Sequence, residues 1–290
     1  MNGRGFLMRA WIVGLLIAGM HAGTAGAQTA GLGIQPMRLE LEVMPGKTRT
    51  ASFSIEAPPS DNEVRGRLML GLTDWSIHED TSVTYQDPGT QPRSAASWIT
   101  FTPSDVGISS GQQRLVRVTA AVPQQAEPGL YTAALFVQER PPTRLPQIGE
   151  QLFQFRFRYV VTLYVIVPPV FRQAEIADLQ LQSDAQGTRL VTRLQNTGTR
   201  HLRPMISWFV RARGREVVAE HNTEATVLLP GTLSNETLTL SDPLPPGGCE
   251  IEVQVDFNDG RPVQAVRRMV DTDELAAMSA SITPPVALAQ

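Results

Sequence analysis

The sequence is poor in the residues from which reactive and metal-binding sites are usually built. Its 290 residues include one cysteine, four histidines and a single lysine, Lys47, and only 6% are aromatic. So little material is left for a metal cluster or a nucleophile relay that we expect no metal, no cofactor and no enzyme activity. The formal net charge is −3, so no dominant basic field favours nucleic acid as a partner.

One short motif is shared with hydrolases. Gly107–Gly111 reads G-x-S-x-G, but a nucleophile elbow needs a strand, a sharp turn and then a helix. The residues that follow, Arg114–Val118, alternate between apolar and polar as in a strand. We therefore interpret the motif as a turn between two strands.

The remaining polar candidates lack the spacing of a catalytic or metal site. Asp74, Glu79 and Asp80 lie close together in the sequence, and we expect them to be surface charges. His201 and His221 are not part of any H-x-H or H-E-x-x-H pattern. Both lie near predicted turns, so we expect them to be solvated.

Residues 1–27 have the three parts of a secretory signal peptide. Arg4 and Arg9 form a positive start, Ala10–Met20 is a short apolar stretch, and Ala25–Ala27 is an A-x-A cleavage signal. The apolar stretch is shorter than the ~20 residues that span a bilayer. We expect cleavage after Ala27 and an exported mature protein without a membrane span; an uncleaved anchor is the alternative.

Exported proteins often contain disulfides, but the single cysteine excludes an intrachain bridge. Cys249 alternates with polar residues and shares its face with Ile251, Val253 and Val255. This pattern predicts a small buried core residue. The alternative is a reactive or pairing thiol.

Apolar and polar residues alternate with a period of two along most of the chain, which is typical of strands. Examples are Ala51–Ile55, Leu68–Leu72, Val116–Val122, Tyr131–Val137 and Cys249–Phe257. Turn clusters such as Asp87–Gly89 and Ser109–Gly111 separate these runs, and Asn258–Gly260 predicts a hairpin before a last strand at Val263–Val270. Many short strands between turns predict an all-β protein of two tandem immunoglobulin-like β-sandwich domains.

Proline places the boundary between the two domains. Val167–Val170 contains the pair Pro168-Pro169, which cannot continue a strand ladder. The expected organisation is a signal peptide (1–27), a first immunoglobulin-like domain (28–168), a second β-sandwich (169–271) and a flexible tail (272–290).

Four segments in the first domain resemble the periplasmic pilus-assembly chaperones of the PapD-like group. They are Ile34–Arg38, Ala96–Pro103, the stretch from Pro123 to Pro142, and the strand ending at Val165–Pro168. The resemblance covers about half of the chain. It implies an immunoglobulin-like N-terminal domain, a periplasmic location, and pilin-like exported subunits or an outer-membrane usher as partners.

The last strand of this domain is unusually long. From Leu152 it reads LFQFRFRYVVTLYVIV, a run of about 50 Å at ~3.3 Å per residue. One face carries the apolar row Phe153, Phe155, Phe157 and Tyr159, and the other begins with Gln154, Arg156 and Arg158. A long apolar edge invites aggregation unless it has a partner. The resemblance implies that this row completes a partner subunit by strand addition; the alternative is a row that only lines the core.

Chaperones of this group also anchor the carboxylate of the subunit's C-terminus with an arginine of the first strand and a lysine of the last. Arg38 matches the arginine, whereas the lysine has no clear counterpart, since Lys47 is the only lysine. Arg158 or Arg156 could substitute for it. The alternative is that Arg38 is an ordinary surface charge.

These observations favour a periplasmic chaperone-like protein that binds partner subunits by β-strand addition in pilus or fimbria assembly. The second hypothesis is a secreted structural or adhesive surface protein whose tandem immunoglobulin-like domains serve as spacers.

Overall fold

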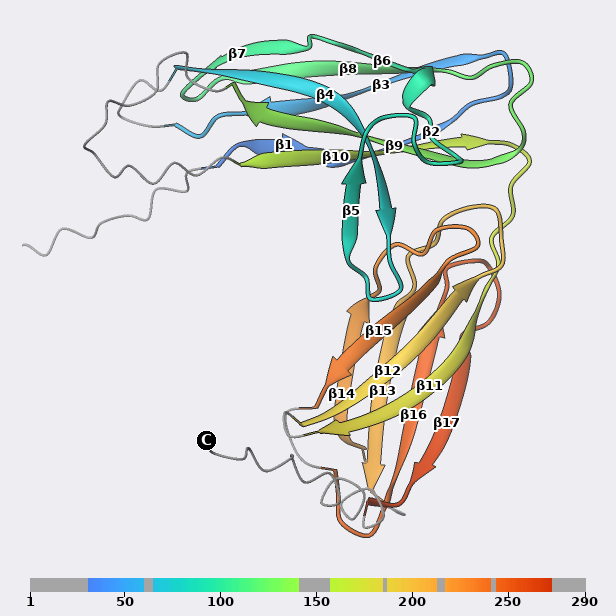
Figure 1. Ribbon diagram of the computed structural model, residues 1–290. Coiled ribbons are helices and arrows are strands. Elements are labelled where there is room, and N and C mark those ends of the chain that lie inside the picture. Colours follow the sequence, from blue (N-terminus) through green and yellow to red (C-terminus); the bar gives the residue numbers. More distant parts are fainter. Residues whose placement is uncertain are drawn as a thin grey trace, which may run out of the picture. The chain divides into compact units, whose positions relative to one another are not determined.

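The computed structural model describes residues 31–59, 65–140, 157–184, 187–212, 217–240 and 244–272. Within these residues the elements are strands, with one short 3-10 helix, η1 (Ala96–Trp98). Figure 1 shows their arrangement. The predicted signal peptide and nearly all of the predicted tail lie outside the described residues.

The first ten strands run through the part of the chain that precedes Pro168. Their bounds are β1 (Gly33–Gln35), β2 (Arg38–Glu42), β3 (Thr48–Glu56), β4 (Arg65–Ile77), β5 (Val83–Gln86), β6 (Ile99–Thr102), β7 (Asp105–Ser109), β8 (Gln113–Ala121), β9 (Gly129–Glu139) and β10 (Arg158–Val167). They form two sheets, one in the order β1-β3-β8-β6 and one in the order β2-β10-β9-β4-β5, with β7 also paired to β4. The described strand pairs of these sheets are antiparallel except β10 with β2, which is parallel.

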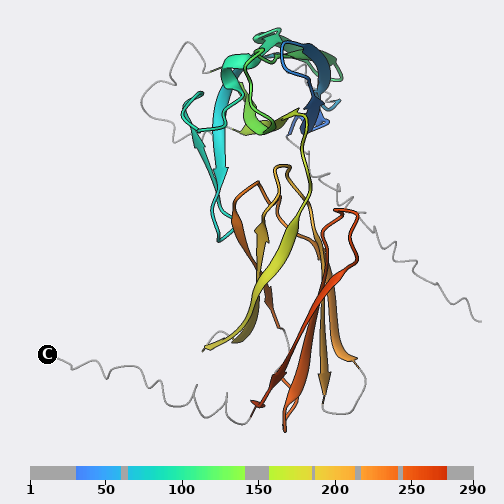
Figure 2. The same cartoon turned by 90° about the vertical axis from the view of Figure 1, so that its right-hand side faces the viewer.

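The remaining strands form a second sandwich. They are β11 (Ala174–Asp184), β12 (Gly187–Asn196), β13 (Met205–Ala212), β14 (Val217–Glu224), β15 (Leu233–Thr239), β16 (Cys249–Asp256) and β17 (Gln264–Val270). One sheet has the order β11-β12-β15 and the other the order β14-β13-β16-β17. Figure 2 shows these strands in two layers. The chain is therefore all-β, with two tandem β-sandwiches, as the alternation predicts; from Leu32 onward it forms one compact unit.

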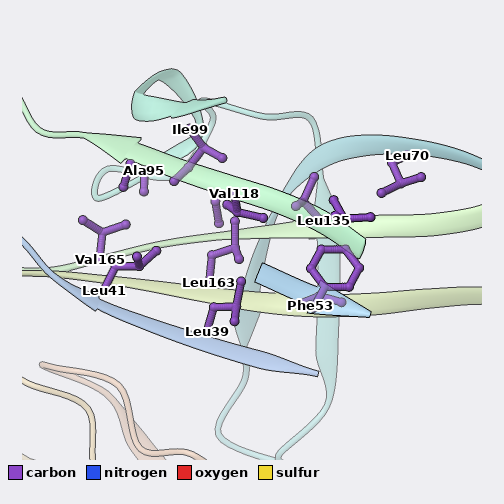
Figure 3. Packing of buried hydrophobic residues seen from close by; sticks show 14 of the residues in the cluster. Leu39, Leu41, Phe53, Leu70, Ala95, Ile99, Val118, Leu135, Leu163 and Val165 are labelled. Atoms are coloured by element: carbon purple, nitrogen blue, oxygen red, sulfur yellow. The ribbon is translucent and has the colours of Figure 1, made fainter. Parts of the chain in front are cut away.

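Alternation places one face of each strand of the first sandwich in the core between its two sheets. Leu39 and Leu41 of β2 lie opposite Leu163 and Val165 of β10, and all four are buried. In Figure 3 these side chains point into the same cluster as those of the other sheet. Apolar burial at ~25 cal/mol per Å² is the main stabilising contribution in such a core.

The second sandwich has a core of its own, centred on Trp208. The indole Nε1 of Trp208 donates to the hydroxyl of Thr192 at 3.0 Å, so the polar atom of the buried ring is satisfied. Cys249 is fully buried in the same cluster, and burial raises the pKa of its thiol. The prediction that Cys249 is a core residue is confirmed.

The G-x-S-x-G motif is a turn between two strands. Its first residues belong to β7 and the turn ends at Gly111, whose φ of 71° suits glycine. β8 follows directly, without a helix. The turn interpretation is confirmed.

The hairpin near the end of the chain is longer than a two-residue turn. β16 and β17 pair as predicted, and their last pair is Val255 with Gln264. The connection between the strands covers residues 257–263, with positive φ at Asn258 (51°) and Gly260 (84°). A type I′ turn would require positive φ at two adjacent residues, so this connection is not a type I′ turn.

Asp74 corrects one expectation, because it is buried rather than a surface charge. Its carboxylate accepts hydrogen bonds from the backbone N–H groups of Gly89 (3.0 Å) and Gln91 (2.9 Å) and from the hydroxyl of Ser94 (2.7 Å). The side chain therefore organises the loop that follows β5. Local sequence could not indicate this, because its partners lie beyond the next strand.

Candidate functional site: the open edge of strand β10

β10 has a neighbouring strand on both sides along only part of its length. β9 pairs with it from Arg158 to Val167. β2 pairs only with the stretch from Thr162 to Ile166. Among the described residues, Arg158–Val161 therefore has a strand on one side and an open edge on the other.

The hydrogen bonds to β2 reveal which backbone groups face this edge. Thr162 N–H donates to the carbonyl of Met37, and the carbonyl of Ile166 accepts from Val43 N–H, both at 2.9 Å. Backbone groups of alternate residues point to the same side of a strand. The N–H and C=O groups of Arg158 and Val160 therefore point to the open edge, where a further strand could pair with them.

The apolar row of β10 passes from the core into solvent along this edge. Val161 and Leu163 are fully buried, Tyr159 is half-buried and Phe157 is 57% exposed. The phenol oxygen of Tyr159 accepts a hydrogen bond from the backbone N–H of Leu32 at 2.9 Å, which fixes this ring beside β1. The centroids of the Phe157 and Tyr159 rings lie 6.5 Å apart.

Only the second half of the predicted donor row is described. Phe153 and Phe155 lie outside the described residues, as do Gln154 and Arg156. Within the described part the two interpretations of the row apply to different residues. From Val161 onward the row lines the core, and at Phe157 it is exposed.

Arg158 lies on the opposite face of β10 from Phe157. Its Nε donates to Oε1 of Gln138 at 2.8 Å, and its guanidinium carbon lies 4.9 Å from the centroid of the Phe136 ring. Among the described side chains, no carboxylate forms an ion pair with Arg158.

Arg38 is the first residue of β2 and lies opposite Thr162. Its side chain is half-exposed, and its Nε is 3.6 Å from Oε1 of Glu40. Arg158 is four positions before Thr162 on β10, or ~13 Å along the strand. The structure therefore does not bring Arg158 next to Arg38.

A second arginine binds β10 two residues beyond Thr162, the residue opposite Arg38. Arg203, between β12 and β13, donates to the hydroxyl of Tyr164 at 3.3 Å. Burial raises the pKa of Tyr164, and the positive charges of Arg203 and Arg38 oppose this rise. Two arginines thus act on one buried phenol. The sequence analysis missed Arg203, which is far from Arg38 in the sequence and belongs to no motif.

His201 corrects a second expectation, because it is 6% exposed rather than solvated. Its ring stacks on Tyr164 with centroids 4.3 Å apart, and its Nε2 lies 3.2 Å from Oε1 of Glu40. Burial lowers the pKa of His201, although the carboxylate of Glu40 opposes this shift.

Glu40 is the acidic centre of this group. Burial by itself would raise the pKa of Glu40, but the interaction with His201 and the charges of Arg38 and Arg200 outweigh it and hold the pKa below its usual range. Arg200 Nη2 lies 3.5 Å from Oε2 of Glu40. Residues of the second sandwich therefore bind the outward face of β2.

Where the structure describes the chain, no three or more His, Cys, Asp or Glu side chains are grouped to hold a metal ion. No helix in those ranges is long and apolar enough to cross a membrane.

No family model and no curated protein matches the sequence. Among solved structures the chain is similar to the chaperone YadV, with 12% identity over 82% of this chain and 99% of that chain and a TM-score of 0.45. It is also similar to the class 5 fimbriae chaperone CfaA (10% identity, 82% and 98% covered, TM-score 0.43). A third is the CsuC–CsuE chaperone–tip adhesion subunit pre-assembly complex of Acinetobacter baumannii (13% identity, 82% and 98%, TM-score 0.43). Each of these three structures contains a chaperone.

Proposed function

We propose that this protein is a periplasmic chaperone-like protein that binds exported partner subunits by β-strand addition at the open edge Arg158–Val161. The observation that carries the proposal is the edge itself. Arg158 and Val160 direct backbone hydrogen-bonding groups away from β9 at a point that β2 does not cover. Strand addition uses such groups for affinity and side-chain pockets for specificity.

The side chains beside this edge define the partner. Phe157 and Tyr159 form the exposed end of a row that continues into the core at Val161. A partner strand with alternating apolar residues could bury Phe157, at a gain of ~25 cal/mol per Å² of apolar surface. The exposed ring therefore favours binding over a purely structural role.

Arg38 supplies an anchor for a carboxylate at the end of the open edge. It lies opposite Thr162, where β2 begins, and Arg203 donates a hydrogen bond to the hydroxyl of Tyr164, two residues further along β10. Two guanidinium groups can hold a carboxylate by charge-assisted hydrogen bonds. We assign Arg38 to the carboxylate of a bound subunit, with Arg203 in place of the missing lysine.

Export belongs to the same proposal. The pattern of Arg4, the apolar stretch and Ala25–Ala27 favours cleavage before Gln28 and release into the periplasm. Mass spectrometry of the protein from a bacterial periplasmic extract should find Gln28 at the N-terminus. An intact Met1 in the membrane fraction would contradict this part of the proposal.

The binding test uses a short synthetic peptide of alternating valine and threonine with a fluorescent label. Its binding is measured by fluorescence polarisation, and amide exchange is followed by NMR. The amides of Arg158 and Val160 should exchange fast in the free protein and become protected when the peptide binds. The amides of Tyr159 and Val161 face β9 and should be protected in both states.

Phe157→Ser should weaken peptide binding strongly without changing the melting temperature. Phe171→Ser is the matched control, because Phe171 is 54% exposed but lies beyond the end of β10. Equal binding by both variants, or no protection of Arg158 and Val160, would refute strand addition at this edge.

A further inference from the structure

We propose that Arg158 selects partner strands that carry a carboxylate on the face opposite their apolar row. This inference rests on the proposed strand addition and specifies the chemistry of the partner. It assigns to Arg158 a role beside the open edge, separate from any part in holding a terminal carboxylate.

The first step is the position of the guanidinium group. Arg158 begins β10 at the open edge and directs its side chain to the face away from the core row. A strand added at this edge would place every second side chain on that face, next to Arg158 and Val160. Arg158 is exposed, so its charge is accessible to such a strand.

The second step is its orientation, which contacts with two residues of the neighbouring strand β9 favour. Gln138, directly opposite Arg158 on β9, accepts a hydrogen bond from Nε at 2.8 Å. Phe136, the next residue on the same face of β9, lies under the guanidinium carbon at 4.9 Å. Such cation–π contacts contribute about 0.5–1 kcal/mol at exposed sites.

The third step explains why the Phe136 ring has room beneath the guanidinium group of Arg158. It pairs with Gly71 of β4. A Cβ atom added to Gly71 would lie 2.3 Å from Cζ of Phe136, so only glycine leaves room for the ring there. Gly71, Phe136 and Arg158 thus form a stack across β4, β9 and β10, three strands that lie side by side in Figure 1.

The fourth step is the lack of a carboxylate partner. Arg38, Arg67, Arg93 and Arg140 of the first sandwich each have an aspartate or glutamate within ion-pair distance, whereas the described parts of the chain show none for Arg49, Arg114 and Arg117. Arg158 has none in the ranges that the structure describes, and its Nε is bound to a neutral amide. The stack therefore holds an unneutralised cation beside the open edge, which is complementary to an acidic residue of an added strand.

The test uses three labelled peptides of alternating valine and threonine in which one central threonine is kept, changed to glutamate or changed to lysine. The regular alternation lets each peptide shift by two residues, so the charged residue can reach Arg158. The wild-type protein should bind the glutamate peptide up to about fivefold more tightly than the threonine peptide, as expected for a cross-strand ion pair. The preference should decrease at about 1 M salt.

Charge reversal gives the decisive comparison. Arg158→Glu should invert the preference, so that the lysine peptide binds best. Arg117→Glu is the matched control, since Arg117 is exposed on β8 of the other sheet and the change in net charge is the same. Arg117→Glu should keep the preference for glutamate.

Gly71→Ala and Phe136→Leu test the stack. Both should reduce the preference for glutamate over threonine while leaving the affinity for the threonine peptide unchanged. If the wild type binds all three peptides equally, the role of Arg158 is refuted and strand addition stands. If none of the peptides binds, both proposals are refuted.

Discussion

Arg38 and Thr162 lie directly opposite each other in the parallel pairing of β2 with β10, and this pair marks the end of the open edge. From Thr162 to Ile166, β10 pairs with β2 on one edge and with β9 on the other. Before Thr162, β10 pairs only with β9, and the exposed Phe157 directly precedes the strand. Parallel strand pairs require a crossover connection, and here β2 and β10 are joined through most of the first sandwich. The length of β2 therefore sets how much of β10 lacks a second neighbouring strand.

The exposure gradient along β10 predicts a matching gradient in stability. Leu163→Ala removes a fully buried side chain and should lower the free energy of unfolding by about 2–5 kcal/mol. Phe157→Ala should change it by no more than about 0.5 kcal/mol, because that ring is mostly solvent-exposed. Chemical denaturation of both variants measures the difference. A large loss from Phe157→Ala would mean that the ring belongs to the core.

His201 predicts a decrease in stability at mildly acidic pH. Its folded-state pKa lies below the ordinary value of 6.5, so the unfolded chain binds the proton more readily. Stability should therefore decrease as the pH falls through about 6.5. The positive charges of Arg200 and Arg203 disfavour the protonated ring and add to this loss, whereas the carboxylate of Glu40 reduces it.

The measurement is the melting temperature between about pH 7.5 and about pH 5.5. His201→Gln should have a smaller decrease than the wild type over this range. His221→Gln, at an exposed position, should behave like the wild type. The lowered pKa of Glu40 adds a further loss of stability only at lower pH, as that carboxylate becomes protonated.

Cys249 should react slowly with a thiol reagent in the native protein and quickly after denaturation. The side chain is fully buried, and burial raises the pKa of the thiol, so the reactive thiolate is scarce. A Leu115→Cys, Cys249→Ala variant is the control, because Leu115 is 61% exposed and a thiol there should react at once. Fast labelling of native Cys249 would place it at the surface.

Asp74→Ala should destabilise the first sandwich by about 2–4 kcal/mol, since two backbone N–H groups and a hydroxyl lose a charged acceptor. Asp80→Ala is the control at an exposed carboxylate. Denaturant unfolding compares the two variants. Equal stability would mean that the loop from Gly89 to Ser94 is held by other contacts.

Alternation alone was enough to predict much of this fold. Runs such as Val116–Val122 and Tyr131–Val137 became β8 and β9, and Cys249 faced the core as its pattern predicted. These predictions succeed because a strand's side-chain period is local and sets which face is buried. The sequence also predicted an apolar row through Phe157 and Tyr159 on one face of β10, and the described part of that row continues to the buried Val161.

Only the tertiary structure decided where that row stops being core and becomes edge. The boundary depends on where β2, distant in the sequence, begins to pair, and no pattern in β10 itself encodes it. Burial of Asp74 and His201, and the hydrogen bond from Arg203 to Tyr164, likewise arise from contacts between separate strands and loops. A polar residue's environment is set by the partners that folding brings to it, so local sequence predicted the strands but not the site.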